Sequence, residues 1–199
     1  MKNLLQQLKI SIIATLVFAV VVSGLYPLAV WAIGQVFFPA QANGSLITNK
    51  QGTVIGSTLI GQEFTLPQYF HPRPSAAGAG YDPIASGGSN LGPTSQKLAD
   101  EIKGRIADYR KENNLATSTP VPADAVTASA SGLDPEISIE NAQIQIARVA
   151  KARGVDMGQV AALVQNYTEG RSLYVFGEPG VNVLMLNIAL DQNYPILKK

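Results

Sequence analysis

No charged residue occurs between Lys9 and Lys50, and residues 10–38 are almost wholly apolar. At about 1.5 Å per residue, a helix over this run is about 43 Å long, which exceeds the hydrocarbon core of a bilayer at about 30 Å. The run predicts a transmembrane helix over about residues 10–38, from Ile10 to Phe38 with Val20 near its middle. Residues 1–38 are then a membrane anchor, and residues 39–199 are one soluble domain.

A cleaved secretory signal is the alternative reading of the same segment. Lys2 and Lys9 would form its basic region, and Ala40-Gln41-Ala42 offers a site of the small-x-small type. The apolar regions of such signals are about 7–15 residues long, and Ala42 lies far beyond that distance from the start of the run. The length therefore favours a retained anchor.

The distal half of the run carries aromatic residues and one proline. Trp31 and Phe38 suit the interface between membrane and water, where an aromatic ring is half solvated. Tyr26 precedes Pro27, whose missing N–H predicts a kink or an end of the helix at this point.

The charges around the run predict its orientation. Lys2 and Lys9 precede it, whereas the next cation is Lys50, so the positive-inside rule places the N-terminus in the cytoplasm. The chain is accordingly expected in the inner or plasma membrane as a single-pass protein in contact with lipid. Its soluble domain is expected on the extracytoplasmic side.

The composition of the soluble part excludes several classes of function. Thirteen of the 15 cations and all 14 acids follow the apolar run, so this part is nearly neutral and no nucleic-acid partner is expected. Cysteine is absent and His71 is the single histidine, so no metal site is predicted.

The hydrophobic pattern of the soluble part predicts helices bracketed by strands, which is a small α+β domain. Turn-rich residues 49–52 separate two strands within residues 45–64. Helices are expected over 95–113, from Ser138 to Gly154, and from a capping box at Asp156 to about Tyr167. Residues 173–176 and 181–190 read as strands, the second being the stronger, and residues 114–131 read as a flexible loop.

Two irregular segments are candidates for function because no helix or strand requires their composition. Residues 69–78 contain His71 and Arg73, and prolines on both sides of Arg73 stiffen the backbone. His71 and Arg73 are most simply interpreted as residues that fix this loop. Residues 86–93 are rich in glycine and precede a helix, a pattern that suits either an anion contact or an ordinary surface loop. Their candidate contact residues are Ser86, Gly87, Gly88 and Ser89.

A hydrolase is the least favoured reading of these segments. His71, a serine and Asp82 would supply the residue types of a triad, but no Gly-x-Ser-x-Gly motif is present. No catalytic residue is therefore assigned.

Several of these segments, in this order, resemble the KdpC family, whose members belong to the Kdp-type potassium-transporting ATPases. The matching stretches are Tyr26-Pro27-Leu28 in the anchor and residues 56–62, 69–78, 86–93, 126–134 and 181–191 in the soluble part. The sequence departs from the family pattern at Gly180, where an arginine is expected before Val181.

The resemblance implies a non-catalytic, membrane-anchored subunit of an ATP-driven potassium uptake complex, needed for assembly and activity. Its implied partners are a potassium-binding channel-like subunit, a P-type ATPase subunit and a small single-span subunit. The family is also proposed to act as a catalytic chaperone that raises the ATP affinity of the ATPase subunit. On that proposal ATP is shared rather than bound by this chain alone, and the contacts fall on Gln145 and on Ser86 to Ser89.

The predicted topology conflicts with the nucleotide contact, because an extracytoplasmic domain meets no ATP. Gln145 also has a simpler reading as a solvent-facing helix residue. The alternative to a pump subunit is a membrane-anchored extracytoplasmic module that binds a small ligand through the glycine-rich segment.

Overall fold

The computed structural model describes residues 2–196, which divide into two compact units, one up to Ser57 and one from Thr58 onward. The boundary expected after residue 38 falls inside the first unit. The architecture combines a long N-terminal helix with a region of helices and small sheets, which confirms the predicted α+β class.

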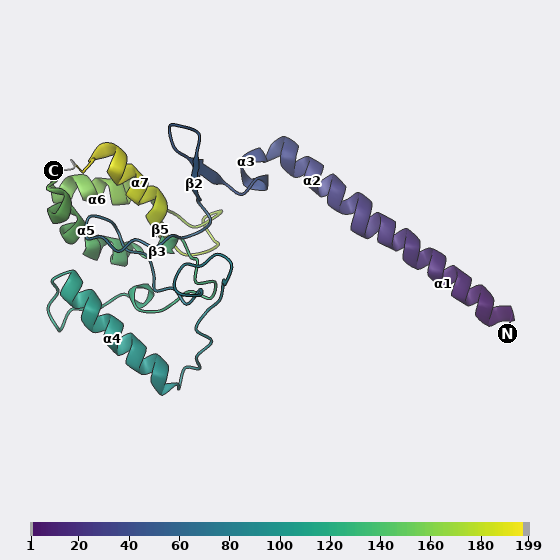
Figure 1. Ribbon diagram of the computed structural model, residues 1–199, viewed down its shortest axis with the longest axis horizontal. Coiled ribbons are helices and arrows are strands. Elements are labelled where there is room, and N and C mark those ends of the chain that lie inside the picture. The colour runs from purple at the N-terminus through teal and green to yellow at the C-terminus, as the bar shows by residue number, and fades with distance from the viewer. Residues whose placement is uncertain (1, 197–199) are drawn as a thin grey trace. The chain divides into compact units, whose positions relative to one another are not determined.

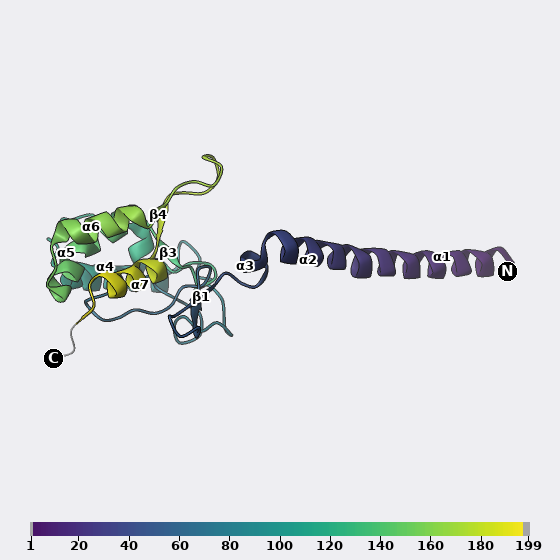
Figure 2. The ribbon, with the colours of Figure 1, turned by 90° about the horizontal axis from the view of Figure 1, so that it is seen from above.

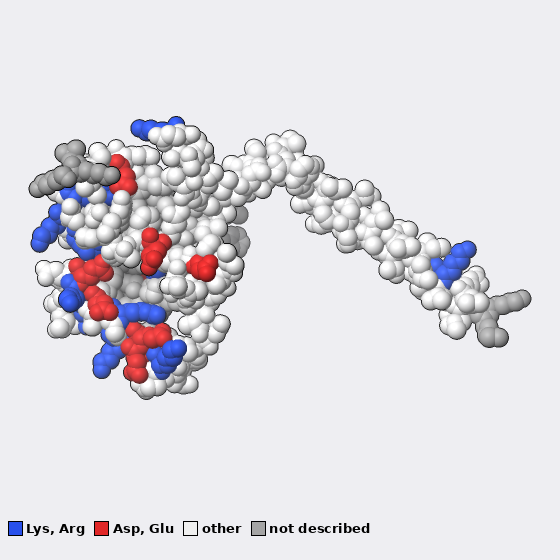
Figure 3. Space-filling model, viewed as in Figure 1, with Lys and Arg blue, Asp and Glu red and all other residues white. Residues whose placement is uncertain are grey.

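The first unit begins with one uninterrupted helical rod (Figure 1). It consists of α1 (Lys2–Val20), a π-helical turn η1 (Val21–Leu25) and α2 (Tyr26–Phe37). By length and composition the stretch Asn3–Phe37, 35 residues with a mean hydropathy of 2.3, is able to cross a membrane, and none of its most apolar part is buried by the protein. Its surface in Figure 3 is almost free of charge.

Pro27 distorts the rod without ending it. The N–H of Tyr26 donates to the carbonyl of Val21, five residues earlier, rather than to the usual residue four earlier. In a regular α-helix the ring of Pro27 would press against the carbonyl of Ser23. The wider π-helical turn directly before Pro27 accommodates the ring, so the helix continues to Phe37.

The first unit ends in the predicted hairpin, after a short helix α3 (Pro39–Ala42). Strand β1 (Leu46–Thr48) pairs with β2 (Val54–Ser57) in antiparallel fashion, with Leu46 opposite Ser57. The side chain of Asn49 accepts hydrogen bonds from the N–H groups of Gln51 and Thr53, which holds the turn.

The core of the second unit lies among α5 (Ile139–Arg153), α6 (Met157–Asn166) and α7 (Val183–Asn193), which gather beside a small sheet (Figures 1 and 2). The sheet has the order β3 (Glu136–Ile137), β5 (Gly180–Asn182), β4 (Thr168–Glu169), and all pairs are antiparallel. The buried apolar side chains of this core include Phe70, Ile137, Ala142, Ile146, Val149, Val160, Val164, Val181, Leu186 and Leu190.

The predicted helix boundaries of this unit are confirmed. Ser138 caps α5, and Gly154 ends it in the left-handed conformation at φ 68°. The capping box of Asp156 and Gln159 opens α6. Ser95 caps α4 (Gln96–Glu112), a largely exposed helix of which Tyr109 alone is a buried residue.

The predicted strand over residues 181–190 is wrong beyond Asn182. The chain leaves β5 there, and Asn182 caps α7 by accepting from the N–H of Met185. Helix α7 is buried on most sides, with Leu184, Leu186 and Leu190 all inside the core. A helix without a polar face gives no 3.6-residue signal, so its alternate leucines resemble a strand pattern.

The predicted strand over residues 173–176 is also wrong. This segment is the exposed tip of a loop between β4 and β5, where a single bridge joins Ser172 to Phe176. Residues 114–131 contain one 3-10 turn, η2 (Ala123–Ala125), and the flexibility expected there stays a prediction. The carboxylate of Asp124 accepts from the backbone and hydroxyl of Ser138, which fixes the start of α5.

Gly180 lies beside two carboxylates of the sheet. Gly180 lies opposite Glu169 of the neighbouring strand β4. A Cβ at position 180 would lie 2.9 Å from a carboxylate oxygen of Glu136. Burial, followed by the charges of Glu169 and Asp134, raises the pKa of Glu136 above 4.5. Because the folded pKa is raised, this carboxyl opposes folding as pH rises through that range.

We expect Gly180→Arg to stabilise the fold relative to Gly180→Ala by about 0.2–1 kcal/mol at pH 7, the range for a cross-strand pair of opposite charges. Both variants share the contact of the Cβ with Glu136, so this contact cancels in their difference. The part of the gain that depends on Glu136 should disappear once Glu136 is protonated at acid pH. Urea unfolding at pH 7 and pH 4 measures it, and equal stability of the two variants at pH 7 would contradict the prediction.

Candidate functional site

The candidate segment around His71 is an extended strap that crosses the core. We define the strap as residues 67–74; the ring of its Phe70 is completely buried. Asn187 of α7 serves the backbone of Phe70 as a strand partner would: its Oδ1 accepts from the N–H at 2.8 Å, and its Nδ2 donates to the carbonyl at 2.9 Å. A side-chain amide thereby satisfies buried backbone that no sheet reaches.

Gln145 of α5 repeats this arrangement at the next residue of the strap. Its Oε1 accepts from the N–H of His71 at 2.7 Å, and its Nε2 donates to the carbonyl of His71 at 3.1 Å and to Asn141 at 2.9 Å. Only 1% of Gln145 is exposed, so its reading as a solvent-facing residue is wrong. The sequence spacing indicated this burial, because Gln145 shares a helix face with the apolar residues Ala142 and Val149.

Arg148, one turn further along α5, joins the strap to the end of α4. Its guanidinium donates to the carbonyls of Pro67 and Tyr69, to Asn113 and to the Oε1 of Gln145 at 2.6 Å. Burial lowers the pKa of Arg148, while the neighbouring charge of Glu112 raises it. Arg148 was not predicted from the sequence. The sequence alone does not show whether an arginine on a helix is buried and hydrogen-bonded to other segments or exposed to solvent.

His71 completes the network. Its Nδ1 lies 2.6 Å from a carboxylate oxygen of Glu112, and its Nε2 lies 3.0 Å from the carbonyl of Leu66. Asp82 is engaged elsewhere, since it accepts from the N–H of Ile84. In the described chain the ring of His71 therefore has the partners of a residue that fixes a loop, and Asp82 is not the residue that orients it.

The ion pair of His71 and Glu112 has a consequence for acid stability. Burial alone raises the pKa of Glu112, but the hydrogen bond and charge of His71 and the charge of Arg148 together bring it below 4.5. A lowered folded pKa means that the stabilisation is present above the unfolded pKa and is lost as pH falls through the folded value.

We expect Glu112→Gln to cost about 1 kcal/mol of unfolding free energy at pH 6, a value discounted because the Glu112 side chain is about a third exposed. The difference from wild type should shrink as pH falls from about 4.5 and vanish below the lowered pKa of Glu112 in the folded protein, where the carboxylate is protonated. Chemical denaturation at a series of pH values measures it, with Asp108→Asn on the exposed face of α4 as control. A difference that does not change with pH would contradict the assignment.

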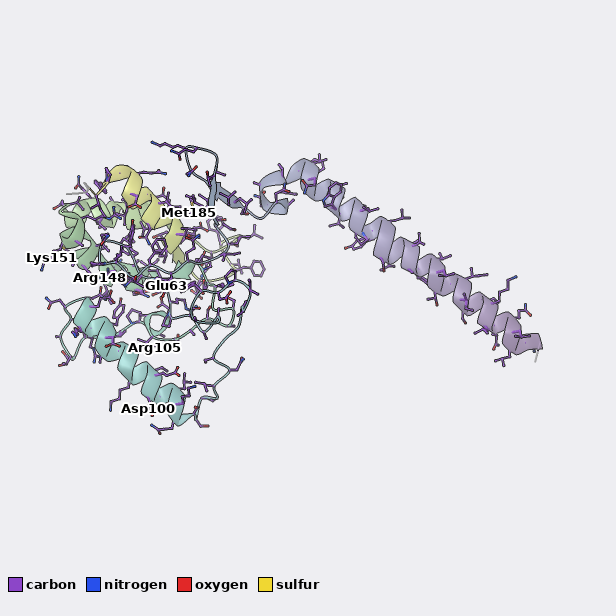
Figure 4. The ribbon with its side chains drawn as sticks, viewed as in Figure 1. Glu63, Asp100, Arg105, Arg148, Lys151 and Met185 are labelled. Carbon is purple, nitrogen blue, oxygen red and sulfur yellow. The ribbon has the colours of Figure 1, made fainter. Side chains whose placement is uncertain are left out.

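Arg73 ties the other end of the strap. Its Nη1 lies 2.7 Å from Asp134, and the hydroxyl of Tyr81 donates to its carbonyl at 2.7 Å. Its buried Nε has no hydrogen-bond partner among the described residues. One cavity of about 330 Å³ is lined by Arg73, His71 and Gln145. Glu63, from the loop after β2, and Arg105, from α4, also line this cavity (Figure 4).

The glycine-rich segment is packed against another loop. The N–H of Gly87 and the hydroxyl of Ser86 both donate to the carbonyl of Ser131, at 2.8 and 2.9 Å. A Cβ on Gly88 would lie 3.2 Å from the carbonyl of Ala130. None of Ser86 to Ser89 lines the cavity that contains Gln145, so the structure does not bring the two sets of candidate nucleotide contacts together there.

The sequence matches the family described as KdpC, the K+-transporting ATPase c chain, over residues 8–192. The chain belongs to this family. The KdpC subunit of the potassium-transporting ATPase of Mycobacterium tuberculosis H37Rv is 54% identical over 187 residues, which cover 94% of this chain and 98% of the relative. The corresponding subunit of Myxococcus xanthus is 55% identical over 181 residues, covering 90% and 85%, and that of Rhodospirillum rubrum is 57% identical over 171 residues, covering 86% and 88%.

The match confirms the KdpC resemblance drawn from the motifs. It covers most of the apolar helix as well as the second unit, so the helix is part of what the family shares. One N-terminal apolar helix fits a single-pass membrane protein of a transport complex. Val20, Tyr26, Pro27 and Trp31 all lie within this helix, whereas Phe38 follows its last residue, Phe37.

Proposed function

We propose that this chain is the membrane-anchored, non-catalytic subunit that a potassium-transporting ATPase requires for assembly and activity. The match to the KdpC family across residues 8–192 carries the proposal. The chemistry of the strap supports its non-catalytic part: His71, Arg73 and Gln145 each hold backbone or a carboxylate of the same domain. The partners are a potassium-binding channel-like subunit, a P-type ATPase subunit and a small single-span subunit.

Purification from mild detergent tests the assembly. The tagged chain should retain the P-type ATPase subunit in stoichiometric amount. In that complex His71→Ala should keep most of the ATPase turnover per assembled unit, because a general acid–base residue contributes typically about 10²–10⁴-fold. A loss of that size with assembly unchanged would refute the non-catalytic role. A wild-type chain that purifies alone would favour the alternative of a small-ligand binding module that uses the glycine-rich segment at residues 86–93.

The second unit faces the extracytoplasmic side in this proposal, because Lys2 and Lys9 precede the apolar run. Protease added to intact spheroplasts should then digest it. Protection until lysis would place it in the cytoplasm and favour the family proposal that this subunit raises the ATP affinity of the ATPase. The amide of Gln145 is already used by His71 and Asn141, which argues against a nucleotide contact at this residue on either side of the membrane.

A further inference from the structure

The loop between β4 and β5 presents an apolar surface that no other part of the second unit covers. We define the loop tip as residues 173–176. Leu173 is 81% exposed, Tyr174 95%, Val175 68% and Phe176 65%. In Figure 2 this loop projects away from β4 and from the helices of the core. Exposing four consecutive large apolar side chains to water costs free energy, and these side chains are not part of the buried core of this unit.

The loop tip is held in one shape despite its exposure. Ser172 and Phe176 exchange two backbone hydrogen bonds of 2.9 Å, and the ion pair of Arg171 and Glu178, 2.7 Å long, closes the base of the loop. The N–H groups of Tyr174 and Val175 also donate within the loop. These backbone donors need no water, so the tip is suited to burial against another surface.

The backbone of the tip is strained. Leu173 and Tyr174 have φ values of 52° and 62°, in the left-handed region that bulky side chains rarely adopt. Strain of this kind persists where the surrounding structure fixes it, and it concentrates at functional positions. Exposure and strain together indicate that the tip takes part in a contact with another molecule.

Charge and area distinguish among the surfaces that would cover the tip. Glu169 and Glu178 outnumber Arg171 at its base, and Arg171 is paired with Glu178, so the base provides no cationic attraction to an anionic lipid surface. The four side chains offer on the order of 500 Å², less than the roughly 800 Å² per partner of a stable binary interface. The tip is therefore one contact within a larger assembly, and a dimer of this chain does not follow from it.

We propose that the loop tip inserts into an apolar groove on another subunit of the potassium-transporting ATPase, with Tyr174 and Phe176 as its anchors. The rim of that groove is neutral or basic, which complements the acidic base of the loop. Aromatic side chains dominate such contacts, because they bury much area with few rotatable bonds. This inference rests on the proposed function, since it takes the partner from the same complex.

Site-specific photo-crosslinking tests the proposal in the full chain, expressed with the other subunits in native membranes. A benzophenone amino acid in place of Tyr174 should give an adduct that mass spectrometry identifies as a partner subunit. The same probe in place of Ile84, 95% exposed in a different loop, is the matched control and should not give this adduct. Adducts with lipid only, with a second copy only, or with neither would overturn the proposal.

A double variant provides the second test. Tyr174→Ser with Phe176→Ser should reduce retention of the partner subunits about tenfold or more, whereas Ile84→Ser should not. Because these side chains lie outside the core, thermal unfolding of both variants should match wild type. Full retention by the double variant would overturn the loop contact while leaving the proposed function intact. Failure of the wild-type chain to retain any ATPase subunit would overturn both.

Discussion

Replacement of Gln145 by leucine is expected to lower the free energy of unfolding of the second unit by about 3–5 kcal/mol. Leucine has a similar volume, so the expected loss does not come from a cavity. It comes mainly from the N–H and carbonyl of His71, which would lose their side-chain partner inside the protein. Asn141 and Arg148 would each lose one of several hydrogen bonds. Buried groups without partners cost about 1–3 kcal/mol each, and the separate costs are not additive.

Gln143→Leu is the matched control, because Gln143 lies on the exposed side of the same helix. Its expected change is within about 0.5 kcal/mol. Urea unfolding of the full chain in detergent measures both variants, and hydrogen exchange of the strap locates the loss. If Gln145→Leu cost no more than Gln143→Leu, the strap would not depend on the amide of α5.

The helices and the first hairpin were predictable because their signals are local. Ser95, Ser138 and Asp156 stand where helices begin, Gly154 stands where one ends, and Asn49 marks the hairpin turn. Each of these residues acts on backbone within a few positions of itself. A short stretch of sequence therefore contains all the information that the prediction requires.

The strand predicted over 181–190 failed because burial removed the pattern on which the prediction depends. Helix α7 has Val183, Leu186 and Leu190 on one side and Leu184 on another, so no polar face remains until Asp191. The cap at Asn182 was a local signal for the helix, but the alternating leucines resembled a strand more closely. Tertiary packing decided between the two.

The polar network was predictable in its residues but not in its connections. His71 and Arg73 drew attention by their composition, yet their partners Glu112 and Asp134 lie far away along the chain. Asn187 and Gln145 are 117 and 74 positions from the strap backbone that they hold. Such contacts depend on how the helices pack, which no spacing within a single segment encodes.

The irregular backbone of the strap explains why His71, Arg73 and Gln145, the functional candidates in the sequence, are hydrogen-bonded within the second unit. A segment with Pro72 and Pro74 cannot form a regular strand, because proline donates no ladder hydrogen bond. Its buried backbone still requires partners, and the amides of α5 and α7 supply them. Unusual composition at residues 69–78 therefore reflects the demands of burying an irregular segment, whereas the exposed loop tip lies outside the core and is the surface proposed above for a partner.

A charge in the membrane helix should have the other large effect. Val20→Arg is expected to cost about 2.5–3.5 kcal/mol on membrane-insertion scales, because a charge near the middle of the bilayer loses its hydration. Val20 is 62% exposed at the end of α1, and no part of the described protein shields it. We expect the variant to be lost from the membrane fraction or from the assembled complex.

Val20→Leu is the control for this change, since it keeps the apolar surface and should behave as wild type. Carbonate extraction of membranes measures retention, and purification through a tag on a partner subunit measures assembly. Full retention and assembly of Val20→Arg would mean that the helix is dispensable and that contacts of the second unit hold the complex. Loss of assembly with retention in the membrane would instead show that a partner helix packs against Val20, because a charged side chain that remains inserted disrupts close helix packing.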